Sequence, residues 1–491
     1  MKTKIVLLSL LIGYSALIQA QWDIDSTQSA GVFGYAGASG SKLVFSNGTE
    51  WNVFDAVTGL HTYGNFTTGR SMIQVVSGNE KVLFAGGKFG YFADPQYTKN
   101  VNVYNSVTNT WSTWNLATAR EVGGAATLGG KAVFAGGTGR TDIAGPVNMY
   151  NKVDIFDLAT GMRTSAKLSK ARSNIASAAA GNKIVFAGGW YWDMMYNVVP
   201  ANNVDIYDVT TGVWTKTTLS KKRDNITAAV VGDKLIFAGG FGPAGAVTNV
   251  DIYNTTTNTW SVTSLPAADY GMRSITIGNE VFFIAGLQGI PGTIYRYNAL
   301  SGTWSSIAMP TSLLNASLSQ VDGRLILAGG TIPGTNTYSD AVQIFDPTTN
   351  TWSSELLSQP RTSISALTYT NIAYFVGGNF AYGYPSPVTT KRVDIFTAPF
   401  KISIGESTPS TTWTALIYPN PVSSYLHIQI SEDADFPMTL MITDQSGNTV
   451  INSVITDNEP TIDIGNLPAG IYFITCIYPN ARIITQKVIK Q

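Results

Sequence analysis

Few residues in this 491-residue chain carry the groups that most often do catalytic chemistry. The sequence holds two histidines, His61 and His427, and one cysteine, Cys476. A zinc cluster or a histidine-dependent triad needs several such groups close together, so one built on residues 21–400 would depend on His61 alone. We interpret His61 as an ordinary strand residue, and we predict no metal site and no cofactor.

Six arginines recur, the first five at intervals of 50 to 52 residues, each near the start of a strand-like run: Arg70, Arg120, Arg172, Arg223, Arg273 and Arg361. Aspartates such as Asp205, Asp251 and Asp394 recur in the same way. Because a catalytic pair should break a repeat, this recurrence favours hydrogen-bonding posts between repeats. The alternative is a cationic ring that binds anionic sugars, since a guanidinium fork suits carboxylates.

Three segments concentrate aromatic side chains: residues 88–99 (KFGYFADPQYTK), 190–197 (WYWDMMYN) and 379–385 (NFAYGYP). Exposed aromatic rings stack on sugars or anchor protein partners. Equally, such rings can pack on one another as the cores of loops. The candidate binding residues are Tyr91, Phe92, Trp190, Tyr191, Trp192, Tyr196, Phe380, Tyr382 and Tyr384.

The elements that must position these residues belong to a repeat. The segment VLFAGG (82–87) is the first of seven related copies at intervals of 44 to 52 residues, and LVFSNG (43–48) is a degenerate eighth copy. An alternating segment such as VDIYD (204–208) follows each copy, and a tryptophan-containing run usually comes next. Alternation of apolar and polar residues predicts half-buried strands, so each repeat is predicted to form four short strands.

Four antiparallel strands per repeat of this length resemble a blade of the kelch family of β-propellers. The resemblance covers residues 22 to about 400 and rests on the glycine pair, the aromatic residue of the VDIYD-like segment and the spaced tryptophan. It implies an all-β fold with a kelch-type β-propeller of eight four-stranded blades, with seven as the alternative. Eight blades close if Trp22 and its neighbours supply the outer strand of the last blade, which lacks its own tryptophan run.

In such a propeller the long, variable loops share one face, and the aromatic segments lie in three of them. The six arginines would lie at the mouth of the central channel. Some kelch propellers resemble galactose oxidase, whose copper site needs two histidines and a tyrosine cross-linked to cysteine. His427 and Cys476 both lie beyond the predicted propeller, so no copper-radical site is predicted.

The end of the chain follows another pattern. Residues 401–415 contain the polar run GESTPSTTW and are predicted to be a linker. Residues 416–491 resemble the type A C-terminal sorting domain of the type IX secretion system of Bacteroidetes, a small β-sandwich. The match rests on YPNP (418–421), LPAGIY (467–472) and the basic tail 487–490. It implies recognition by the secretion translocon and a secreted or outer-membrane surface-attached protein.

The first residues predict export. Residues 1–20 place Lys2 and Lys4 before the apolar run 5–12 and end in a small residue, Ala20. This is typical of a signal peptide that directs Sec export to the periplasm and is cleaved before Gln21. No later run reaches the roughly 18 apolar residues of a membrane span, so no transmembrane segment is predicted.

Composition excludes some partners. The chain has 31 basic and 31 acidic residues, and nucleic-acid binding normally needs a basic surface, so no nucleic-acid partner is predicted. A single cysteine excludes an internal disulfide framework.

The predicted function is binding of a glycan, or of a surface or extracellular protein, through the long-loop face. The alternative is a cofactor-free enzyme on sugars, epimerase- or lyase-like, with its site at the channel mouth. A nonrepeating Asp or Glu in a closed pocket near Arg120 or Arg223 would favour the enzyme. An open aromatic surface would favour binding.

Overall fold

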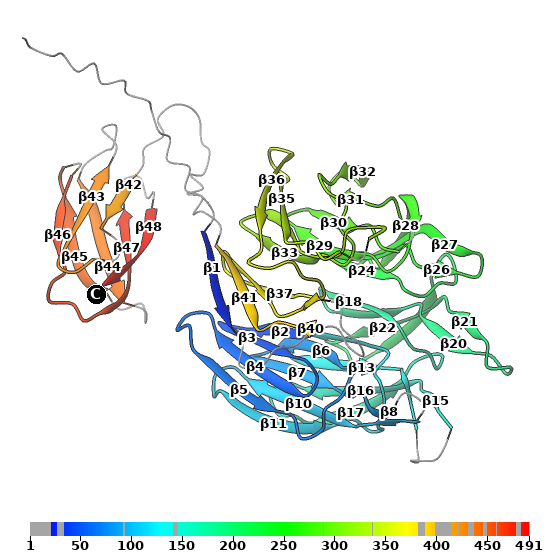
Figure 1. The fold of residues 1–491 in the computed structure, drawn as a ribbon. Helices are drawn as coiled ribbons and strands as arrows, with labels where there is room; N and C mark the ends of the chain where they lie inside the picture. The colour runs from blue at the N-terminus through cyan, green and yellow to red at the C-terminus, as the bar shows by residue number, and fades with distance from the viewer. Residues whose placement is uncertain are drawn as a thin grey trace, which may run out of the picture. The chain divides into compact units, whose positions relative to one another are not determined.

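The computed structural model describes residues 21–26, 34–91, 94–140, 146–287, 289–335, 337–381, 388–397, 415–419, 422–430, 437–444, 449–457, 459–477 and 483–490. The chain divides into two compact units, one up to residue 399 and one from residue 400. All regular elements among the described residues are β-strands (Figure 1), which confirms the all-β prediction. None of them is a helix that could cross a membrane. The predicted signal peptide 1–20 and residues 401–414 of the predicted linker lie outside the described residues.

Among its described residues, the first unit contains eight sheets with four principal antiparallel strands each, besides small two-stranded sheets. Within each sheet the chain usually runs from an inner strand to an outer one. The inner strands are β2 (Tyr35–Ser39), β6 (Gln74–Gly78), β12 (Gly124–Leu128), β18 (Ala176–Ala180), β24 (Thr227–Val231), β29 (Arg273–Ile277), β33 (Ser317–Val321) and β37 (Ser365–Tyr369). The second strands are β3 (Lys42–Ser46), β7 (Lys81–Ala85), β13 (Lys131–Ala135), β19 (Lys183–Ala187), β25 (Lys234–Ala238), β30 (Glu280–Ile284), β34 (Arg324–Ala328) and β38 (Ile372–Val376).

The two remaining positions complete each sheet. The third strands are β4 (Glu50–Asp55), β10 (Asn100–Asn105), β16 (Lys152–Asp157), β22 (Asn203–Asp208), β27 (Gly245–Asn254), β31 (Thr293–Asn298), β35 (Ala341–Asp346) and β41 (Arg392–Thr397). The outer strands are β5 (His61–Asn65), β11 (Thr110–Asn115), β17 (Arg163–Lys167), β23 (Trp214–Thr218), β28 (Thr259–Asp269), β32 (Thr303–Ala308), β36 (Thr351–Leu356) and β1 (Gln21–Ser26). The predicted four-strand repeat is therefore confirmed.

The inner strands close a ring. Each packs beside the inner strand of the next sheet, and β37 packs beside β2. The last sheet is completed from the other end of the chain, because β1 pairs with β41 so that Gln21 lies opposite Thr397. This confirms the expectation that the N-terminal strand supplies the missing outer strand, and it leaves no unpaired strand at the junction.

The repeated segments have distinct packing roles. The second strand is the core of each sheet, and Val82 to Ala85 have no exposed surface. The aromatic residue of the third strand pairs across the sheet with the outer-strand tryptophan, as Tyr207 does with Trp214 at 4.9 Å between ring centroids. The glycine pair turns the chain out of the second strand. Gly137, at φ +104°, could not carry a side chain, because a Cβ there would lie 1.8 Å from the carbonyl oxygen of Glu121.

The second unit is a β-sandwich. One sheet contains β42 (Ala415–Tyr418), β43 (Tyr425–Ile430) and β46 (Thr461–Asp463), and the other contains β45 (Thr449–Ile455), β44 (Met438–Asp444), β47 (Gly470–Ile477) and β48 (Ile483–Lys490). Leu426 and Ile428 of the first sheet share one core with Leu440 and Ile474 of the second. His427, between the two buried residues of β43, is exposed.

Candidate functional site

The long loops between the second and third strands contain small hairpins. They are formed by β8 (Lys88–Tyr91) with β9 (Asp94–Tyr97), β14 (Thr138–Gly139) with β15 (Asn148–Met149), β20 (Trp190–Trp192) with β21 (Val198–Pro200), β26 (Phe241–Gly242) with β27, and β39 (Asn379–Ala381) with β40 (Val388–Thr389). Each sheet is entered through a link, the segment between the outer strand of the preceding sheet and its own inner strand. Isolated bridges such as Ser173 to Trp190 and Thr362 to Asn379 join each hairpin to the link of its sheet. These hairpins and links therefore share one face of the ring.

Residues 190–200 form the hairpin with the most aromatic residues, which we call the tryptophan hairpin. The rings of Trp190 and Trp192 lie 5.5 Å apart between centroids with their planes inclined by 59°. Lys170 places its ammonium group 3.1 Å from the centroid of the Tyr191 ring, a cation–π contact. Trp190, Tyr191 and Trp192 are all half-buried. The base of the hairpin is therefore partly packed and partly open.

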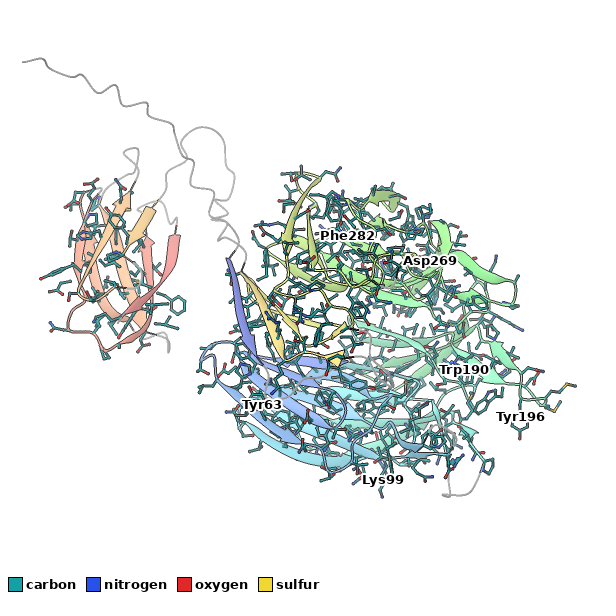
Figure 2. All side chains as sticks on the ribbon, viewed as in Figure 1. Tyr63, Lys99, Trp190, Tyr196, Asp269 and Phe282 are labelled. Atoms are coloured by element: carbon teal, nitrogen blue, oxygen red, sulfur yellow. The ribbon has the colours of Figure 1, made fainter. Side chains whose placement is uncertain are left out.

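The turn of the tryptophan hairpin is fixed by Asp193. Its Oδ1 accepts the backbone N–H groups of Met195 at 2.8 Å and Asn197 at 2.9 Å. Hydrogen bonds from the side chain and backbone of Asn197 hold the pKa of the Asp193 carboxyl below its usual value. The tip exposes Met194, Met195 and Tyr196, with relative exposures of 101%, 83% and 78%. Figure 2 shows Tyr196 at the end of this projecting hairpin, well beyond Trp190.

The other predicted aromatic residues are spread over separate hairpins. Phe380 is half-buried on β39, and Tyr91 ends β8. Phe92, Tyr382 and Tyr384 lie outside the described residues. The structure therefore brings together only the four aromatic residues of the tryptophan hairpin among those that it describes.

Four of the six predicted arginines, Arg120, Arg172, Arg223 and Arg361, have no exposed surface. In Arg172, Nη1 lies 2.8 Å from Asp205 Oδ2, and Nε donates a hydrogen bond to the carbonyl oxygen of Gly188. Asp205 Oδ1 accepts the N–H of Ser169, in the link from the preceding sheet. Burial lowers the pKa of the Arg172 guanidinium, and the carboxylate of Asp205 acts in the opposite direction. This network ties each link to the third strand of its sheet.

Arg70 varies the same arrangement. Its Nη2 donates to Asn102 Oδ1 at 2.7 Å, at the position where the sheets of the four fully buried arginines have an aspartate. Burial lowers its pKa to about 10. The expectation of an open cationic ring is therefore wrong for these five arginines, because they are buried and bind partners inside the sheets.

Arg273 does not belong with the other five, which corrects the predicted set. Arg172 precedes Phe186, the second-strand residue whose carbonyl it binds, by 14 residues. In the sheet of β29 the equivalent position is held by Asp269, which is fully buried and accepts the N–H of Gly286 at 2.7 Å. Tyr295 replaces the third-strand aspartate there. Arg273 instead opens inner strand β29 and is exposed.

Arg273 lines a cavity of about 810 Å³ between the inner strands. Its polar lining residues include Asn174, Asn225, Ser363 and Ser365. Arg273 Nη1 donates to the carbonyl oxygen of Ala316 at 2.7 Å. None of the described residues that line this cavity is an aspartate, a glutamate or a histidine.

His61 lies half-buried on outer strand β5, with its ring 4.7 Å from that of Phe54 and 5.6 Å from that of Tyr63 between centroids. It occupies an ordinary strand position, as we interpreted it. In the part of the chain that the structure describes, no three His, Cys, Asp or Glu side chains come together as a metal site would require.

Comparison with models of protein families finds a match in each of the two units. Residues 416–491 match the model of the secretion system C-terminal sorting domain. Residues 222–264 and 313–355 match the kelch motif. The chain carries kelch motifs and a secretion-sorting domain. Both recognised families agree with the resemblances that we drew from the sequence, and the sorting domain implies an origin in Bacteroidetes.

The sorting domain supports secretion or attachment at the cell surface, and it implies that the kelch protein engages the secretion system. Among solved structures, 421 chains match. One is the structure of YjhT, with 15% identity, coverage of 55% of this chain and 92% of that chain, and a TM-score of 0.37. A search of curated proteins found no match.

Sequence reasoning missed two features of the kelch unit. Met194 and Met195 lie beside predicted residues, but no pattern marks a turn tip as exposed. The substitution of Asp269 at the arginine position was also missed. Counting 14 residues back from the second-strand phenylalanine would have found it, because Phe283 takes the place that Phe186 has in its own sheet.

Proposed function

We propose that the kelch unit is a binding module and that the tryptophan hairpin is its principal contact surface. The observation that carries this proposal is the exposure of Met194, Met195 and Tyr196 on a turn that Asp193 holds in one conformation. Apolar and aromatic side chains on a fixed, projecting turn can bind without a large cost in ordering entropy.

The exposed tip favours a protein partner at the cell surface or outside the cell. Methionine side chains are flexible and polarisable and adapt to irregular apolar surfaces. A projecting tip also reaches into a hollow in a partner more readily than it cradles a sugar ring.

A glycan is the second candidate because Trp190 and Trp192 keep part of their rings open. Sugar stacking needs an open aromatic face, and on Tyr191 one face is already covered by the ammonium group of Lys170.

The enzyme alternative receives less support. An enzyme would be favoured by an Asp or Glu that does not recur in the repeats and that lies in a closed pocket near Arg120 or Arg223. Both arginines are fully buried, and the described lining of the cavity contains no carboxylate that could act as a general acid or base. This supports binding over cofactor-free catalysis.

Export completes the proposal. We infer that residues 1–20 direct the chain through the Sec pathway to the periplasm. The sorting domain then takes the kelch unit to the translocon, after which the unit is released or stays on the cell surface.

The test uses the whole mature chain, with a photo-crosslinking residue placed at position 196, on intact cells of the producing organism and on a glycan array. A tip variant carries serine at Met194 and Met195. We expect a crosslinked surface protein whose yield falls at least tenfold in the tip variant, while the melting temperature stays unchanged.

Val213 provides the matched control. It is an apolar residue, 55% exposed, in the short turn between β22 and β23, on the opposite side of its sheet from the hairpin loop. Val213→Ser should leave crosslinking unchanged. Array binding that disappears only in Trp190→Ala/Trp192→Ala would favour the glycan. Equal crosslinking by wild type and tip variant, with no array binding, would refute the proposed contact surface.

A further inference from the structure

The central channel contains one formal charge among its eight inner strands. Their sequences are YAGAS, QVVSG, GAATL, ASAAA, TAAVV, RSITI, SLSQV and SALTY. Arg273 is the only Lys, Arg, Asp, Glu or His in these strands. Because the other seven inner strands carry only neutral residues, the propeller fold itself does not require this arginine.

Arg273 belongs to a level of the channel at which most inner strands carry a polar side chain. Strand register places Thr227, Arg273, Ser317 and Ser365 at equivalent first positions of four successive inner strands, and all four line the cavity. Tyr35 and Gln74 hold the same position in the next two inner strands, and Gly124 and Ala176 hold it in the other two. The arginine therefore has polar neighbours on both sides at this level.

The guanidinium of Arg273 has unused donors. Its one hydrogen bond among the described residues runs from Nη1 to the carbonyl oxygen of Ala316. Unlike the four fully buried arginines, it faces no carboxylate within the described residues. The side chain is open to the channel, but the strands around it still desolvate the guanidinium and lower its pKa with no opposing charge, and the group stays protonated. A cation left without a counter-charge in a partly desolvated site favours the binding of an anion.

Further polar groups surround it. The side-chain amide of Asn174 donates to Asn225 Oδ1 at 3.0 Å, and the side chain of Asn225 also hydrogen-bonds to the Asp224 carboxyl. The hydroxyls of Ser363 and Ser365 have no hydrogen-bond partner among the described residues and line the same cavity. Amides and hydroxyls of this kind bind the hydroxyl groups of a ligand.

We propose that this cavity binds a small acidic sugar, with the carboxylate of the ligand on Arg273 and its hydroxyls on the surrounding asparagine and serine side chains. A guanidinium binds a carboxylate with two parallel hydrogen bonds, and no lining carboxylate repels the anion. The cavity volume of about 810 Å³ lies in the range of small-molecule sites, roughly 300 to 1,000 Å³.

This site is separate from the tryptophan hairpin. None of the cavity-lining residues comes from residues 190–200. The two proposals can therefore fail independently, since the tip variant leaves the channel intact and Arg273 variants leave the hairpin intact.

The test is calorimetric titration of the full mature chain with sodium glucuronate and, in parallel, with glucose, which has similar hydroxyls but no charge. We expect glucuronate to bind more tightly than glucose. Arg273→Gln should weaken glucuronate binding at least about tenfold, as expected for a lost charge-assisted pair, and should leave glucose binding unchanged. Lys216→Gln removes an exposed outer-strand cation and should change neither.

Several results would overturn the proposal: equal affinity for glucuronate and glucose, no binding of glucuronate, or full binding by Arg273→Gln. Inorganic phosphate that displaces glucuronate at equal concentration would overturn the assignment to a carboxylate. If Arg273→Gln fails to fold, Arg273→Lys decides, because it keeps the charge but loses the two-pronged geometry. Weaker glucuronate binding by this folded variant supports the proposal, and unchanged binding refutes it.

Discussion

Arg172 and Arg273 belong to one ring of sheets but to different environments. Arg172 is fully buried, bonds to backbone carbonyls and faces Asp205, and four other sheets repeat this arrangement with Asp or Asn as partner. Arg273 appears once, opens into a cavity and faces no carboxylate among the described residues. Residue type alone does not separate them. Position relative to the strand register does.

The contrast teaches how to search a repeat protein for function. A polar group that returns in most repeats meets the same structural need each time, here the fastening of a link to a third strand. A polar group that occurs once has no such need to explain it. The sheet of β29 departs from the repeat at two positions. Its arginine position holds the buried Asp269, and its inner strand carries the open Arg273.

The largest effect should come from breaking the buried pair. Asp205→Ala leaves the guanidinium of Arg172 buried without a counter-charge, and we expect a loss of about 3 to 5 kcal/mol in the free energy of unfolding. Urea unfolding followed by tryptophan fluorescence measures it.

Arg273→Gln is the control for Asp205→Ala. It should lower the free energy of unfolding by less than about 1 kcal/mol, because removing the Arg273 guanidinium leaves no buried carboxylate without a counter-charge. Equal losses for the two variants would show that the comparison between the arginines has no energetic basis.

A smaller effect is expected where packing enforces the glycine repeat. Gly137→Ala keeps φ at +104° and places a Cβ against the carbonyl oxygen of Glu121, so we expect about 2 to 3 kcal/mol of destabilisation. Gly212 also has positive φ, +74°, but no atom lies within 4 Å of an added Cβ, and Gly212→Ala should cost about 1 kcal/mol. Thermal unfolding measures the loss of stability in each variant. A loss in Gly212→Ala as large as that in Gly137→Ala would contradict the role of the close contact.

The smallest effect concerns an ion pair nearer the surface. Partial burial alone would raise the pKa of Asp55, but hydrogen bonds from Lys42 and Ser41 lower it to about 2, below the ordinary 3.8. The charged pair therefore stabilises the fold above about pH 4, and this contribution is lost as pH falls toward 2. Lys42→Met should cost at most about 1 kcal/mol at pH 7, and the difference from wild type should vanish near pH 2. A difference in melting temperature that stayed constant between pH 6 and pH 2 would contradict this origin.

The repeat was predictable because its causes are local. Alternation in VDIYD (204–208), the glycine pair and the spaced tryptophan each reflect the packing of one strand, and the pairing of β1 with β41 followed from the missing outer strand. Arg273 was grouped wrongly because, in its repeat, the arginine position holds aspartate and the nearest arginine lies four residues later. The spacing of 14 residues to the second-strand phenylalanine marks that difference.

The chemical types of the binding candidates were predictable, but their exposure was not. Tyr191 is partly packed because Lys170 covers one face of its ring, and Trp190 is partly packed against Trp192. Met194 and Met195 are open because a single aspartate sets the turn. Both outcomes depend on tertiary contacts that no periodicity in the sequence records.

The pairing of β1 with β41 has a consequence for how the kelch unit acquires its structure. β1 pairs late, since its partner β41 becomes available only after the strands of seven other sheets have been made. Until then β1 lacks its partner strand, and the last sheet keeps an open edge that other chains could join. Contacts of such high sequence separation slow folding. Ring closure is therefore a late kinetic step, and an agent that binds either end in the meantime could delay it.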